Sequence, residues 1–157
     1  MEYLVDDDDS QPPLAGKLAH ALALLSGRMS QEKINSLTHA IFREDLLTPE
    51  LYMMHFLFEA MVKINKLEEV EHLIIKYWKP ILDRGCQTIW EMGVHQQGKS
   101  AINNYGSLCH AFSLAPVNFL QRHILGLIPS KEGFPKFTFN LQLGKLSWLK
   151  GSLETPT

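Results

Sequence analysis

The segment LYMMHFLFEAMVKIN, residues 51–65, is apolar nearly all the way round when it is drawn as a helix. A helix of this kind must be covered on most sides, so it belongs in the interior of a multi-helix assembly. Thr48, Pro49 and Glu50 suit a helix start, with a capping hydroxyl, a proline where no amide donor is needed, and an acid near the positive end of the dipole. The segment predicts an interior helix in a mainly α protein.

The following segment is amphipathic. Residues 67–82, LEEVEHLIIKYWKPIL, carry charges on one side and a row of large apolar side chains on the other, namely Leu67, Val70, Ile74, Trp78 and Ile81. This pattern predicts an outer helix, which Pro80 should kink or end. Because the short link Asn65-Lys66 joins it to the interior helix, the two predict an αα-hairpin.

A second hairpin is predicted nearer the N-terminus. Apolar residues recur at helical spacing over residues 14–25, and Gly27 stands where a C-terminal cap is expected. Ser30 can cap another helix over residues 31–41, whose apolar side chains form a single stripe. That helix should be half exposed.

The apolar period changes toward the C-terminus. Ser107 can cap a helix over residues 108–127, which Pro116 should break or bend. Over residues 136–143 apolar and polar side chains alternate, which predicts a strand with one buried face, and Gly144-Lys145 can turn the chain after it. We therefore expect a helical domain over residues 1–130 and the beginning of a β domain over residues 131–157.

Composition narrows the classes of partner. A chain of 157 residues with 45% apolar residues has the size and composition of one domain with a core. The net charge is −2 without a basic stripe, so we expect no nucleic-acid partner. No run of about 18 apolar residues predicts a membrane span, and the N-terminus lacks the pattern of a signal peptide. The chain is expected to be cytoplasmic, although a fragment could have lost a targeting segment.

Cysteine and histidine usage predicts no cofactor and no metal site. Cys86 and Cys109 are too few for a disulfide framework and lack a CxxC spacing, so both are expected to be free thiols that act as small buried hydrophobes. Their spacing from His95 and His110 is irregular, whereas zinc sites usually show tight ligand pairs.

The loop over residues 85–106, GCQTIWEMGVHQQGKSAINNYG, is aperiodic and lies between helical segments, where functional residues are frequent. Its Trp90-Glu91 pair suits a carbohydrate site, which combines an aromatic face for the sugar ring with a carboxylate that moves protons. For the pair taken alone, a core tryptophan beside a surface acid is the better explanation. His110, which follows the loop, could face the same cavity as Glu91 or could be a packing histidine.

Three segments in order, GCQTIWE, GSLCHAFSLAPVNFLQRHILGLIP and FPKFTFNLQLGKLSWLKGSLETPT, resemble the C-terminal part of the bacterial α-L-rhamnosidase-like glycoside hydrolases, glycoside hydrolase family 78. In that family a G-A-T-[TS]-[IVL]-W-E segment closes the catalytic (α/α)₆ barrel. A helix of the kind S-x-C-H-[GA]-[WF]-S-x-x-P and an L-G-x-L-x-W-x-[KE]-G turn follow. The resemblance covers residues 85–157 and, more loosely, residues 6–82.

The resemblance implies a fold and a set of roles. The fold would be a partial (α/α)₆ barrel of about five helices, followed by the first strands of a C-terminal β-sandwich. Glu91 would be the general base of an inverting glycosidase acting on terminal deoxy-sugar glycosides, Trp90 would shape the sugar subsite, and His110 would contact a hydroxyl. The family's general acid would lie upstream of Met1, so the chain would be a C-terminal fragment that is inactive alone.

Two departures from the family leave the substrate open. Gln87 stands where the family often has alanine, and Met92-Gly93-Val94 replaces an arginine-tryptophan-aspartate run. Another sugar hydrolase of the same barrel class is therefore an alternative, and so is a non-catalytic helical module that binds carbohydrate or protein. A fragment of a barrel would expose the inner face of the apolar helix, which predicts self-association or a missing N-terminal portion.

Overall fold

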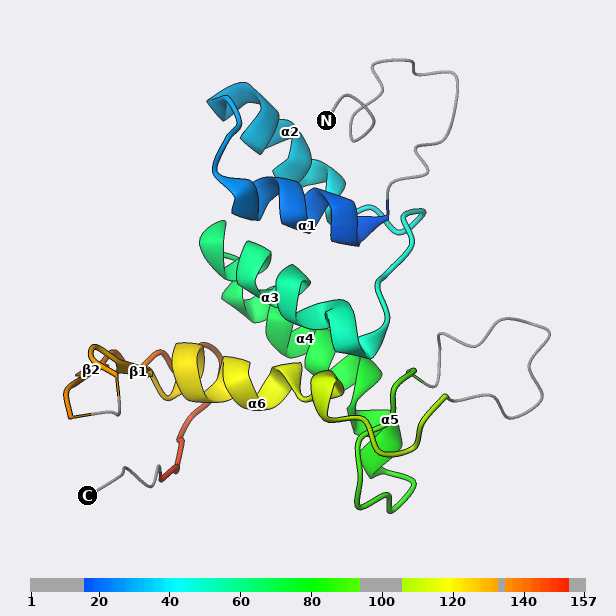
Figure 1. The fold of residues 1–157 in the computed structure, drawn as a ribbon, viewed down its shortest axis with the longest axis vertical. Coiled ribbons are helices and arrows are strands. Elements are labelled where there is room, and N and C mark those ends of the chain that lie inside the picture. The colour runs from blue at the N-terminus through cyan, green and yellow to red at the C-terminus, as the bar shows by residue number, and fades with distance from the viewer. Residues whose placement is uncertain (1–15, 94–105, 133–134, 153–157) are drawn as a thin grey trace.

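The computed structural model describes residues 16–93, 106–132 and 135–152, and these residues are mainly helical, as predicted (Figure 1). No helix within these ranges has the length and apolar character needed to cross a membrane. The elements are α1 (Lys17–Ser26), α2 (Gln31–Ala40), the 3₁₀ turn η2 (Leu51–Met53), α3 (Met54–Lys63), α4 (Leu67–Tyr77), α5 (Lys79–Leu82), the 3₁₀ turn η3 (Ala111–Ser113), α6 (Ala115–Phe119), its π-helical continuation η4 (Leu120–Ile124), and the strands β1 (Leu127–Pro129) and β2 (Phe137–Phe139).

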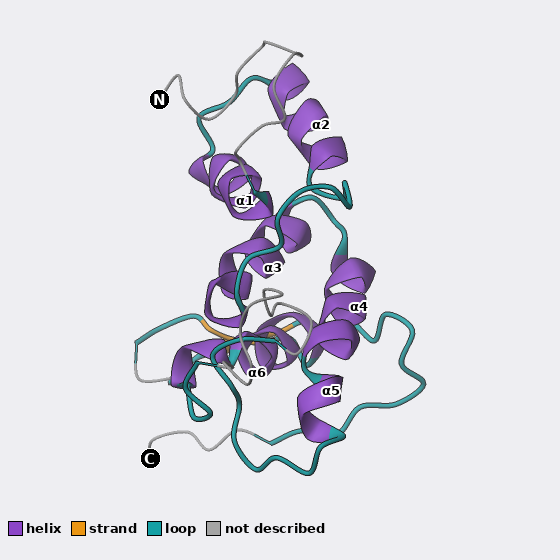
Figure 2. Cartoon of the chain, turned by 90° about the vertical axis from the view of Figure 1, so that its right-hand side faces the viewer, coloured by secondary structure: helices purple, strands orange, loops and turns teal. Residues whose placement is uncertain are grey.

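α3 is the central helix of the described fold. It contacts α1, α4 and α6 (Figures 1 and 2). Its residues Met54, Leu57, Phe58, Ala60 and Met61 are all buried. The ring of Phe58 packs against Trp78 of the outer hairpin segment and against Phe119 of α6, with centroid distances of 5.7 and 5.8 Å. The prediction of an interior helix is confirmed.

The predicted large exposed face of this helix is wrong for the described residues. α1, α4 and α6 already cover α3, and Phe56, with 38% of its surface exposed, is the large apolar side chain of α3 that stays exposed. Larger exposed fractions occur around α6 instead, where Phe112 and Val117 are 79% and 57% exposed. The described apolar side chains available to a partner therefore lie mainly outside α3.

Most helix ends follow the local sequence signals. Gly27 ends α1 in the left-handed region with φ 66°, and the Ser30 hydroxyl accepts a hydrogen bond from Lys33 N, 3.3 Å away, at the start of α2. Pro80 lies in the first turn of α5, so it ends α4 and opens a short new helix. Glu50 precedes η2 without making a side-chain cap, so the interior helix begins with a tighter turn than predicted.

The predicted helix from residue 108 is wrong up to residue 114. The Ser107 hydroxyl bonds the backbone of Cys109 instead of capping a helix, and the amide of His110 donates to Ile89 O over 2.9 Å. This segment therefore pairs with distant residues rather than with itself. Pro116 lies in the first turn of α6, where its missing amide hydrogen costs no hydrogen bond.

The C-terminal strand pairs with a strand that the sequence did not reveal. β1 and β2 are antiparallel, with Leu127 opposite Phe139, and β1 precedes residue 130 while β2 follows it, so the sheet joins the two predicted domains. The predicted turn at Gly144-Lys145 is confirmed. The predicted buried face is wrong, because Phe137 and Phe139 are 54% and 59% exposed. Alternation defines the two faces of a strand but does not decide which one another layer covers.

Candidate functional site

Two segments far apart in sequence lie side by side and hold Glu91. The Glu91 amide donates to Ser107 O over 2.8 Å, and the Ser107 amide donates back to Oε2 of the Glu91 side chain over 2.9 Å. The Thr88 hydroxyl donates to Leu108 O over 2.6 Å, so the contact between the two segments extends beyond Glu91 and Ser107. Residues 88–91 and 107–110 are thereby fixed against each other across the undescribed residues 94–105.

Gly106 permits the close approach that this arrangement needs. Its φ of 65° lies in the left-handed region, which favours glycine. A Cβ atom at this position would lie 2.7 Å from Oε2 of Glu91. Both the backbone conformation and the proximity of the carboxylate therefore require a glycine here.

Trp90 is placed differently from its neighbour. Its ring is 7% exposed and belongs to the hydrophobic core, whereas Glu91 is half-buried. Trp90 therefore anchors the segment that presents Glu91 and offers little face for a sugar ring. The exposed aromatic ring nearby is Phe112, whose centroid lies 5.7 Å from that of His110.

His110 lies between two helical turns. Its ring packs edge-on against Tyr52 of η2, with the centroids 5.7 Å apart, and its Nδ1 lies 3.2 Å from the hydroxyl of Ser113 in η3. Ser113 is fully buried, and its carbonyl accepts a 2.8 Å hydrogen bond from the Trp78 indole. These contacts fix the ring plane, and Nε2 has no hydrogen-bond partner within the described ranges. His110 is thus held where it could bond a ligand hydroxyl.

Glu50 is a second carboxyl of this region, and it was not predicted as a site residue. Burial, followed by repulsion from the charge of Glu91, raises the pKa of Glu50 above its ordinary value. Its Oε2 atom is buried and has no hydrogen-bond partner in the described part of the chain. The sequence signal at Glu50 was fully explained by a helix start, so nothing local pointed to a role beside Glu91.

The cysteines and the metal-binding residue types add no further chemistry to this region. Both thiols are free, as predicted, but Cys109 is exposed rather than buried because its segment forms no helix. Over the described residues, no three His, Cys, Asp or Glu side chains gather closely enough to hold a metal ion.

Comparison with protein-family models and with curated proteins found no match to this chain. The link to family 78 glycosidases therefore remains a prediction from the three motifs.

Proposed function

We propose that Glu91 is the general base of a glycosidase-like site for terminal deoxy-sugar glycosides, within a partial (α/α)₆ barrel. The observation that carries the proposal is the position of Glu91, whose Oε2 accepts a 2.9 Å hydrogen bond from the Ser107 amide, near a second carboxyl, Glu50, whose pKa is raised by burial and by the charge of Glu91. Inverting glycosidases use one carboxylate to activate water and one carboxylic acid to protonate the leaving oxygen. In such enzymes the acid and the base are usually distinguished by their surroundings, which give the two carboxyls different pKa values.

Each group has a role in the proposed reaction. Oε2 of Glu91 is engaged by the Ser107 amide, which orients the carboxylate. The carboxylate accepts a proton from water as the water oxygen bonds the anomeric carbon, and the bond to the leaving oxygen breaks as that oxygen receives a proton. Among the described residues Glu50 is our candidate for the acid that supplies it. His110 would bond a sugar hydroxyl, and Phe112 would pack against the ring.

The helical hairpins support the barrel proposal without completing it. α1 packs on α2 and α3 packs on α4, as consecutive hairpins of a six-hairpin barrel would. Such a barrel has twelve helices, so the described helices would form part of its wall. We therefore expect sugar binding to be a more sensitive readout than turnover for this chain.

A binding module without catalysis is the second candidate, and one contact favours it. The bond between the Glu91 carboxylate and the Ser107 amide holds residues 91 and 107 together, which is a structural role that needs no reaction. In that case Glu91 would organise a surface for carbohydrate or protein, and proton transfer would play no part.

Glu91→Gln and Glu91→Ala separate the two candidates. Glutamine keeps an oxygen for the Ser107 amide but cannot accept the proton from water, whereas alanine loses both functions. Because the described helices would form part of a barrel wall, we expect little hydrolysis of an aryl rhamnoside by the chain alone. Glu91→Gln should lower whatever turnover is measured by about 10²-fold or more, while rhamnose binding and thermal stability stay near wild type.

Glu44, an exposed glutamate after α2, provides the matched control, and Glu44→Gln should leave every readout unchanged. Equal rates of hydrolysis in wild type and Glu91→Gln would exclude the general-base role. Rhamnose-dependent amide shifts of residues 88–91 and 107–110 that occur without turnover in wild type, are lost in Glu91→Ala and are kept in Glu91→Gln would favour the binding module.

A further inference from the structure

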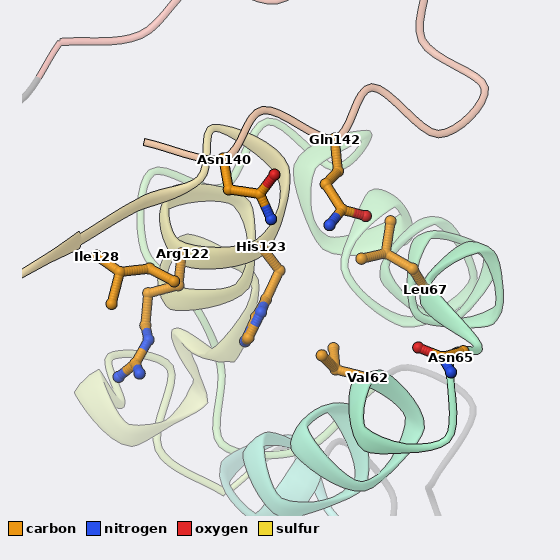
Figure 3. A pocket seen from close by; sticks show the side chains of 8 residues that line it. All are labelled: Val62, Asn65, Leu67, Arg122, His123, Ile128, Asn140 and Gln142. Atoms are coloured by element: carbon orange, nitrogen blue, oxygen red, sulfur yellow. The ribbon is translucent and has the colours of Figure 1, made fainter. Parts of the chain in front are cut away.

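A cavity of about 200 Å³ lies at the C-terminal end of α3, beside Val62 and Asn65 (Figure 3). Glu50 precedes η2 and Asn65 follows α3, and a ten-residue helix is about 15 Å long. The cavity is lined by Val62, Asn65, Leu67, Arg122, His123, Ile128, Asn140 and Gln142. It is therefore separate from the region assigned to Glu91.

The chain after β2 turns its polar face toward this cavity. The Asn140 amide donates to Gly126 O over 2.9 Å and the Gln142 amide donates to Ile124 O over 3.0 Å, so this segment runs along the end of η4. Residues two apart on extended chain share a face, so both carboxamides line the cavity while Leu141, 45% exposed, does not. Asn140 and Gln142 are themselves exposed, so the cavity is open to solvent on this side.

The lining combines hydrogen-bonding groups with an apolar wall. The side chains of Asn65, Asn140 and Gln142 have no hydrogen-bond partner among the described residues, and Figure 3 shows them directed toward a common space with Val62 and Leu67. Each carboxamide offers both donors and an acceptor. A hydroxylated ring matches this set, because its hydroxyls both donate and accept while its ring carbons can pack against Val62, Leu67 and Ile128.

His123 adds an oriented imidazole to the same lining. Its Nε2 lies 3.1 Å from Oε1 of Glu59, and the two side chains are 14% and 28% exposed. The ring also packs against Phe119, with the centroids 5.7 Å apart. The imidazole is thus held in one orientation by α3 and α6, which favours recognition of a ligand over free rotation in solvent.

Size and charge narrow the class of ligand. An apolar cavity of about 150 Å³ can hold benzene, so about 200 Å³ accommodates one six-membered ring with substituents. Among the lining residues, Arg122 is the one with a permanently charged side chain, and it is exposed. The cavity therefore offers a multiply charged anion a single solvated cation, which favours a neutral ligand. A neighbouring cavity shares Asn65, Leu67 and Gln142, which leaves an open side for the rest of a longer molecule.

We propose that this cavity binds a neutral hydroxylated six-membered ring, a monosaccharide unit, through the carboxamides of Asn65, Asn140 and Gln142. The site does not depend on the reaction assigned to Glu91. It would give the chain a carbohydrate contact at each end of α3.

The proposal can be tested by NMR on the complete chain. Glucose, rhamnose or inorganic phosphate is titrated in, and the amide chemical shifts are followed. We expect saturable shifts from at least one sugar in residues 62–67, 122–128 and 140–142. In the Asn140→Ala/Gln142→Ala variant the affinity should fall about tenfold. Leu141→Ala, altered on the opposite face of the same segment, should bind within about twofold of wild type.

The wild-type shift map decides the outcome even where a variant unfolds. Sugar-dependent shifts confined to residues 88–91 and 107–110 would overturn the cavity proposal and leave the Glu91 site intact. Shifts at the cavity that persist in Glu91→Gln would support it independently of catalysis. A response to phosphate alone, or no saturable shift at the cavity with any of the three probes, would overturn it.

Discussion

Glu50 and Glu91 are the same residue type in contrasting surroundings. The Glu91 carboxylate receives a hydrogen bond from the Ser107 amide, whereas Oε2 of Glu50 is buried without a partner in the described ranges. A carboxylate that loses water without gaining donors is disfavoured in its charged form. The difference between the two glutamates therefore comes from solvation and hydrogen bonding rather than from their position in the sequence.

Glu50 should make stability fall as pH rises. Its pKa in the folded state is raised above the ordinary value of 4.5, so the folded chain binds more protons than the unfolded chain between those two values. The free energy of unfolding must then decrease with pH across that window. Glu50→Gln removes this loss, so the variant should match wild type below the ordinary pKa and exceed it in stability at neutral pH.

Urea unfolding at several pH values measures this effect. Glu91→Gln removes the like charge and should weaken the pH dependence contributed by Glu50, since repulsion is the second cause of its raised pKa. Glu44→Gln, on an exposed glutamate, should leave the dependence unchanged. Parallel stability profiles for wild type and Glu50→Gln would show that Glu50 titrates as an ordinary solvated group.

At the scale of elements, Gly126 joins η4 to β1 where two backbones meet. Its φ is 72°, and a Cβ atom there would overlap the carbonyl group of Asn140. Gly85 has the same φ of 72°, but nothing lies within 4 Å of its Cβ position. Alanine substitutions at the two positions can therefore distinguish the free-energy cost of the left-handed conformation from that of a steric clash.

Gly85→Ala should lower the free energy of unfolding by about 1–2 kcal/mol, the usual penalty for a side chain in the left-handed region. Gly126→Ala should lower it further, because the Asn140 segment must also move away from Gly126. Urea unfolding compares the two, and amide shifts of residues 140–142 should change in Gly126→Ala alone. Equal losses of stability in both variants would contradict the close contact with Asn140.

Local signals predicted the elements whose ends depend on neighbouring residues. Gly27, Ser30 and Pro80 mark helix boundaries because caps and missing amide hydrogens act within one turn. The segment after Ser107 was predicted incorrectly, because its backbone bonds go to residues 88–91, and a distant partner leaves no periodic trace in sequence. The same limit applies to β1, which is three residues long and exists through its pairing with β2.

The candidate site was predicted in part for the same reason. Glu91 and His110 flank one loop, so their segments could be expected to lie near each other. Glu50 precedes a separate element, η2, which packs beside η3, and its burial depends on tertiary packing. The burial of Trp90 also depends on tertiary packing, since a tryptophan in a loop can equally line a surface or fill a core.

On the scale of the whole molecule, one run of exposed apolar side chains follows a single helix. Leu114, Val117 and Leu120 lie at intervals of three residues along α6 and η4 and are 42%, 57% and 42% exposed. Residues three apart are neighbours on a helix surface, so these side chains form one patch. Contiguous apolar patches of this kind commonly mark association sites.

We expect the chain to self-associate through this α6 patch, so its average mass in sedimentation velocity should rise with concentration. Val117→Gln/Leu120→Gln should keep it monomeric over the same range, with a loss of stability within about 0.5 kcal/mol because both side chains are exposed. Ile75 is an apolar residue of α4 that is 59% exposed, and Ile75→Gln is the control: it should associate like wild type. Association that survives the double substitution would place the contact elsewhere. A wild-type monomer at every concentration would instead show that this patch is too small to offset the entropy lost when two chains associate.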